Sequence, residues 1–136
     1  MSGGAELLEL DRRECLALLA GGVIGRVVFT DQAMPAVQPV NYVLDREEIL
    51  FRTANGSKLA AAVRHAVVGF QVDEFDPESR LGWTVLGVGE AYEVLDPGRL
   101  AELRGLQPDP WVAGHDAHVI SIPLPLVSGR RLGPAP

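Results

Sequence analysis

Hydrophobic and polar residues alternate along much of the chain, and this alternation predicts a protein built mainly from β-strands. Successive side chains of a strand point to opposite faces, so a half-buried strand has a period of two. Within residues 67–75, for example, Val68, Phe70 and Val72 share one face. Clusters of turn residues separate such runs. The predicted strands are residues 24–30, 36–44, 48–54, 67–75, 82–95, 118–122 and 126–131.

Short helices interrupt these strands at three places. The first helix begins at Asp11, because Asp11 and Glu14 have the spacing of a capping box, and it ends at Gly21. Ser57 begins a second, alanine-rich helix that runs to about residue 64. Pro97 begins a third, since proline is well tolerated in a first helical turn.

This order of elements favours one mainly β domain of the α+β class. The hairpin turn predicted at 45–47 and the continuous strands indicate an antiparallel sheet. About six strands in so short a chain favour a closed or nearly closed barrel, which removes exposed strand edges. We expect residues 1–10 to be a flexible leader, residues 11–131 the single domain and residues 132–136 a tail.

Composition narrows the class of protein. The 136 residues are 47% hydrophobic, enough for a core, and carry a net charge of −6, which argues against a general nucleic-acid binder. No apolar run approaches the roughly 20 residues that cross a membrane, and no signal-peptide pattern is visible. One cysteine, Cys15, excludes an internal disulfide framework. A soluble cytoplasmic protein is expected.

Residues 51–62 carry the strongest hint of chemistry. This segment holds Lys58, the only lysine among 12 basic residues, directly after Gly56 and Ser57 at a predicted helix start. Backbone N–H groups there attract anions, and Arg52, Thr53 and Ser57 add donors for a phosphate. The alternative is an ordinary helix cap and turn flanked by solvated charges.

Two strands carry further candidates. Pro39 cannot donate to a strand ladder, so it marks a sheet edge, a bulge or an open pairing beside which a flat heterocycle could bind. On the strand 82–95, Trp83, Gly87 and Gly89 share one face. That face has room for a flat ligand or for another backbone, including that of a second subunit.

Other catalytic patterns have little support. His65, His115 and His118 do not form a convincing metal set, and we expect no metal. No nucleophile elbow, Walker loop or dinucleotide glycine fingerprint is present.

The pieces together resemble the pyridoxamine 5′-phosphate oxidase-like split barrels that bind flavin mononucleotide (FMN). The matching segments, in the family's order, are residues 24–27, 39–42, 51–53 with 56–58, 72–73, and 82–85 with Gly89. Gln71 and Thr84 depart from the pattern, standing where glutamate and serine are common.

The resemblance implies a six-stranded antiparallel split β-barrel with short flanking helices. It also implies a homodimer with FMN in clefts between the subunits. Arg52, Thr53, Ser57 and Lys58 would hold the phosphate. Pro39, Val40, Asn41 and Tyr42 would run along the flavin ring, mostly through backbone groups, and Trp83 and Thr84 would approach from the partner.

The function expected from the resemblance is a flavin-dependent oxidoreductase with an unknown small-molecule substrate. The chain lacks an obvious basic C-terminal substrate motif, which argues against pyridoxamine phosphate as that substrate. Two alternatives remain: the same fold with a deazaflavin or haem, or a non-enzymatic flavin-binding dimer.

Overall fold

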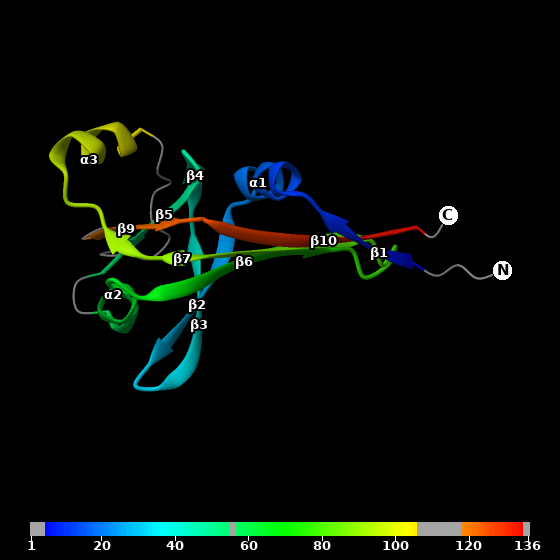
Figure 1. Ribbon diagram of the computed structural model, residues 1–136, viewed down its shortest axis with the longest axis horizontal. Helices are drawn as coiled ribbons and strands as arrows, with labels where there is room; N and C mark the ends of the chain where they lie inside the picture. The colour runs from blue at the N-terminus through cyan, green and yellow to red at the C-terminus, as the bar shows by residue number, and fades with distance from the viewer. Residues whose placement is uncertain (1–4, 55–56, 106–117, 135–136) are drawn as a thin grey trace.

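A computed structural model describes residues 5–54, 57–105 and 118–134 as two antiparallel sheets with three short helices (Figure 1). The larger sheet has the strand order β1-β10-β7-β6-β2-β3 and the smaller has the order β4-β5-β9-β8. The strands are β1 Ala5–Leu10, β2 Ile24–Asp31, β3 Met34–Asn41, β4 Val43–Asp45, β5 Glu48–Thr53, β6 Val67–Phe75, β7 Gly82–Glu90, β8 Tyr92–Glu93, β9 His118–Pro123 and β10 Leu126–Pro134. The helices are α1 Arg12–Ala20, α2 Lys58–Val63 and α3 Pro97–Leu103.

Two of the expected strands bend from one sheet into the other, so each is divided into two strand segments. The run expected at 36–44 divides into β3 and β4 around Tyr42, and the run at 82–95 divides into β7 and β8 around Ala91. Tyr42 and Ala91 are 2% and 0% exposed. Both corners therefore turn around buried residues. The two antiparallel sheets and three short helices confirm the predicted mainly β antiparallel barrel.

The N-terminal segment corrects the expectation of a flexible leader, at least for residues 5–10. These residues form β1, which pairs with β10 from Ala5 opposite Pro134 to Leu10 opposite Gly129. β10 continues to Pro134, past the expected domain end, and so offers β1 a long edge. Backbone pairing that spans more than a hundred residues of sequence leaves no mark in the local pattern.

Local signals set the helix ends and one hairpin as predicted. The side chain of Asp11 accepts a hydrogen bond from the backbone of Glu14, the capping box is complete, and Gly21 is the C-cap of α1. Between β4 and β5, Arg46 and Glu47 have φ of 53° and 60°. Two left-handed residues in succession match the twist of a tight hairpin.

The core lies between the sheets, beneath α1 and α2. Leu19 and Phe70 are fully buried in it, and the ring of Tyr42 meets Phe70 edge to face with centroids 4.8 Å apart. Burial raises the pKa of the Cys15 thiol, as expected for a cysteine that packs in a core. A smaller cluster of Leu50, Val94 and Leu103 lies under α3.

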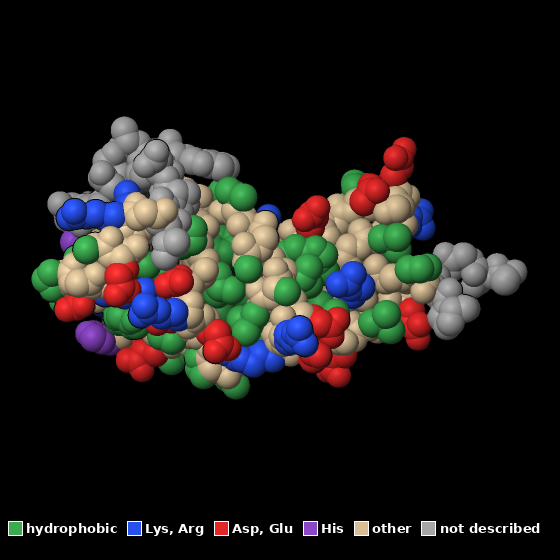
Figure 2. Space-filling model, turned by 90° about the horizontal axis from the view of Figure 1, so that it is seen from above, with side chains coloured by type: hydrophobic (Ala, Val, Ile, Leu, Met, Phe, Trp, Pro, Cys, Tyr) green, Lys and Arg blue, Asp and Glu red, His purple; other side chains and the backbone are tan. Residues whose placement is uncertain are grey.

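The surface has mixed charge. Acidic and basic side chains are interspersed on the face drawn in Figure 2, without a continuous basic patch among the described residues. Within the part of the chain that the structure describes, no helix is long and apolar enough to span a membrane.

Candidate functional site

The predicted anion-binding residues lie around one turn between β5 and α2. Arg52 and Thr53 are the last residues of β5, and the backbone N–H of Ser57 donates to the carbonyl of Ala54 at 3.4 Å to close the turn. Ser57 then caps α2, accepting a hydrogen bond from the N–H of Ala60 at 2.9 Å. Lys58 follows, exposed to solvent. The turn therefore brings the backbone of these four residues close together.

Side chains, rather than the helix, must supply the positive charge at this turn. α2 has only six residues, so few aligned peptide dipoles add up at its start. Ser57 is an ordinary N-cap, as the alternative interpretation expected. Its hydroxyl hydrogen can still be donated, because the cap uses only the oxygen as an acceptor.

Arg52 and Thr53 leave opposite faces of β5. Arg52 follows Leu50, which belongs to the cluster under α3, whereas Thr53 follows Phe51 into the main core. Thr53 is 3% exposed, and its Oγ1 has no hydrogen-bond partner among the described residues. Buried hydroxyls nearly always have a partner. Two basic side chains and two hydroxyls beside one turn are the kinds of donor that a phosphate group needs, although Arg52 and Thr53 approach the turn from opposite faces of β5.

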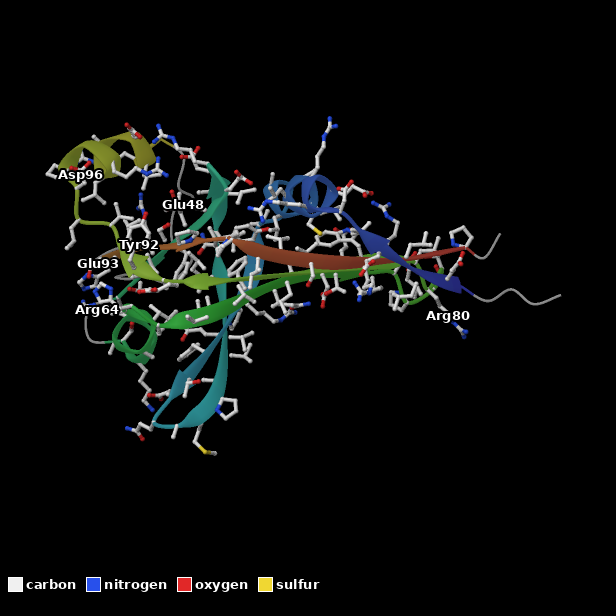
Figure 3. All side chains as sticks on the ribbon, viewed as in Figure 1. Glu48, Arg64, Arg80, Tyr92, Glu93 and Asp96 are labelled. Atoms are coloured by element: carbon white, nitrogen blue, oxygen red, sulfur yellow. The ribbon has the colours of Figure 1, made fainter. Side chains whose placement is uncertain are left out.

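A polar cluster at the other end of α2 was not predicted from the sequence. Glu93 of β8 bonds Arg64 through one carboxylate oxygen at 3.1 Å and the Nδ1 of His118 through the other at 2.7 Å. Figure 3 shows Arg64 and Glu93 close together beside α2. His118 therefore belongs to a hydrogen-bonded cluster around the Glu93 carboxylate. No group of three metal-binding side chains is found in the described ranges, and His115 lies outside them.

The structure confirms that Pro39 marks the edge of a sheet. β3 is an edge strand whose pairing with β2 runs without a break from Met34 to Asn41, so Pro39 marks an edge and no bulge. Pro39 points outward, and Val40 packs partly against the core.

Tyr42 is occupied within the chain. Its backbone N–H donates to Val23 at 3.0 Å, and its buried hydroxyl donates to the carbonyl of Leu19 at 2.6 Å. Tyr42 is also 2% exposed, so its ring and hydroxyl serve the core of this chain.

Trp83 and Thr84 lie far from the turn in the same chain. They begin β7 near the chain termini, whereas α2 lies at the opposite end of the β6–β7 hairpin (Figure 1). Thr84 is six residues from Glu90, at the α2 end, which corresponds to about 20 Å along the strand. A single chain therefore does not bring the two halves of the predicted site together.

The structure adds partners for Thr84 that sequence reasoning missed. The Nε2 of Gln71 donates to the hydroxyl of Thr84 at 3.1 Å, and Arg26 donates to the Oε1 of Gln71 at 3.2 Å. Arg26 also pairs with Pro39 across β2 and β3. The sequence feature that could have indicated this contact is the outward position of Arg26, which lies between the inward Gly25 and Val27 on β2.

The glycines of β7 serve packing inside the chain, which corrects their interpretation as space for a flat ligand or a second subunit. A Cβ at Gly87 would lie 2.6 Å from Leu124, and one at Gly89 would overlap the carbonyl oxygen of Pro123. The segment that lies against these glycines is therefore the connection between β9 and β10, residues 123–125 of the same chain.

Comparison with known proteins identifies relatives along nearly the whole chain. The family described as pyridoxamine 5′-phosphate oxidase matches residues 11–131. An uncharacterised Mycobacterium tuberculosis protein, Rv0080, is 39% identical over 132 residues, covering 93% of this chain and 86% of its own.

Two solved structures show the same fold. The FAD binding protein from Mycobacterium smegmatis is 29% identical, with a TM-score of 0.73 and coverage of 93% of this chain and 98% of its own. A putative pyridoxamine 5′-phosphate oxidase from Corynebacterium glutamicum is 24% identical, with a TM-score of 0.80 and coverage of 100% and 99%.

Proposed function

Because the chain belongs to the pyridoxamine 5′-phosphate oxidase family, we propose that it is a flavin-dependent oxidoreductase that binds FMN between two copies of itself. The observation that carries the proposal is the turn between β5 and α2. It combines Arg52, Ser57 and Lys58 with the buried hydroxyl of Thr53, which has no hydrogen-bond partner among the described residues. A flavin supplies the electron transfer through its own ring, and the protein's part is to bind and orient it.

The remaining contacts would come from two strands. The edge of β3 at Pro39 offers a backbone carbonyl to the ring, since no strand lies beyond β3 among the described residues. Thr84, held by Gln71, would reach the flavin of the partner subunit. This arrangement needs two chains because the turn and Thr84 lie at opposite ends of one β6–β7 hairpin.

An exposed apolar face supports a second copy as the partner. Cross-strand pairing puts Val37, Val28, Gly69, Val88 and Leu126 in one row on the outer face of the larger sheet. The large hydrophobic side chains exposed on this face are Val28, Val37, Val67, Phe75, Leu86 and Leu126. Exposed large apolar side chains in such a row are suited to burial against a second copy, and C2 dimers are the commonest oligomers.

Titration with FMN and riboflavin tests the phosphate site, because riboflavin has the same ring without the phosphate. Lys58→Ala should weaken FMN binding about tenfold or more, as expected for a lost charged contact, and should leave riboflavin binding unchanged. Arg13→Ala, which removes an equally exposed charge from α1, is the matched control. If the wild-type protein binds neither flavin, the proposal is wrong.

FAD is a second candidate ligand, because the M. smegmatis relative is an FAD binding protein. Mass spectrometry of the ligand released from purified protein distinguishes FMN, FAD, a deazaflavin and haem. Turnover with a reduced nicotinamide donor then separates an oxidoreductase from a non-enzymatic flavin-binding dimer, which would retain flavin without turnover.

A further inference from the structure

The carboxylate of Glu93 ties together two segments that border the proposed phosphate site. One oxygen bonds Arg64, the residue that ends α2, and the other bonds His118, the first residue of β9. The side chains of Glu93 and His118 are only 18% and 19% exposed. The bond between Glu93 and His118 is therefore shielded from water and holds its geometry more firmly than an exposed ion pair does, whereas the Arg64 side chain is 51% exposed and its bond to Glu93 is the weaker of the two.

Both tied segments lead directly to the turn. His118 lies opposite Thr53 in the β5–β9 pairing, so it adjoins the residue whose buried hydroxyl has no partner in the described part of the chain. Arg64 ends the same short helix that begins with Ser57 and Lys58. Fixing His118 and Arg64 to one carboxylate therefore constrains the turn from the β5 side and from the α2 side.

We propose that Glu93 is a positioning residue that sets the geometry of this anion site through Arg64 and His118. The inference rests on the proposed function. A carboxylate close to an anion site would by charge alone oppose anion binding. Positioning and simple electrostatics therefore predict opposite signs for the effect of neutralising Glu93.

The test compares FMN with riboflavin on the full-length protein, using flavin fluorescence to obtain both dissociation constants. Glu93→Gln keeps the shape of the side chain but removes the charge and one acceptor. We expect FMN binding to weaken about tenfold, the scale of a lost charge-assisted hydrogen bond. Riboflavin binding should change less than about twofold, because riboflavin carries no phosphate to be positioned.

Two controls separate positioning from general stability. Glu102→Gln removes a carboxylate that also bonds two arginines, Arg46 and Arg99. It should leave unchanged the ratio of the riboflavin dissociation constant to the FMN dissociation constant. His118→Asn keeps an N–H near the position of Nδ1 and should preserve the ratio, whereas His118→Leu should reduce it as Glu93→Gln does. If Glu93→Gln does not fold, the comparison of His118→Asn with His118→Leu tests the positioning role instead.

Tighter FMN binding by Glu93→Gln, or equal weakening of FMN and riboflavin, would overturn the inference and leave the proposed function standing. Failure of the wild-type protein to prefer FMN to riboflavin would instead count against the phosphate site itself.

Discussion

Replacing Gly89 with alanine tests why β7 carries glycine on its inward face. An added Cβ would lie 3.0 Å from the carbonyl carbon of Pro123 and 3.2 Å from the Cδ of Pro125, and it would overlap the oxygen of Pro123. The overlap places it more than about 1 Å inside the ordinary carbon–oxygen contact of about 3.3 Å. A backbone atom cannot escape by changing rotamer, so β7 and the β9–β10 crossing must separate.

The cost should lie at the upper end of the range for overpacked cores, about 3 kcal/mol. In a domain of this size that loss lowers the thermal midpoint by about 10 °C. The matched control is Gly133→Ala in β10, where the nearest atom to an added Cβ is 3.9 Å away. Its midpoint should stay within about 2 °C of the wild-type value, since such a substitution is nearly neutral or slightly stabilising.

The assay is thermal unfolding by circular dichroism at one protein concentration, with and without FMN. If the reasoning is right, Gly89→Ala loses stability by the same amount in both conditions. A variant that keeps the wild-type midpoint without flavin but no longer binds FMN would show that the glycine makes room for a ligand, and the packing argument would fail.

Two further predictions concern Tyr42 and the outer sheet face. Burial raises the pKa of Tyr42 to about 12. As pH rises above the ordinary tyrosine pKa near 10, the unfolded chain therefore loses this proton before the folded chain does. The free energy of unfolding should then fall by up to about 2.7 kcal/mol between pH 10 and 12. Urea unfolding across that range should show this extra fall in wild type and not in Tyr42→Phe, and equal slopes would contradict it. Leu86→Arg puts a charge on the apolar outer face and should yield a monomer by light scattering at micromolar concentration, whereas Arg13→Ala on α1 should stay dimeric; a wild-type monomer would refute the dimer.

Local chemistry in the sequence was enough to predict most of the elements. Alternation located β6 with Val68, Phe70 and Val72 inward, and the Asp11–Glu14 spacing located the start of α1. These signals depend on a residue and its near neighbours, because strand period and helix capping are set within a few positions. The same applies to the Ser57 cap and to the basic residues beside it.

The partner that each face meets depends on contacts between distant parts of the chain, and the sequence pattern does not record them. The pattern placed Gly87 and Gly89 on one face, but the backbone against that face belongs to residues 123–125. It likewise treated residues 5–10 as a leader, although β10 pairs with them. The sequence raises His118 only as a candidate metal ligand. Its bond to Glu93 could not be predicted, because it forms only where β8 meets β9. Periodicity establishes which residues share a face, whereas packing of elements far apart in sequence establishes what that face touches.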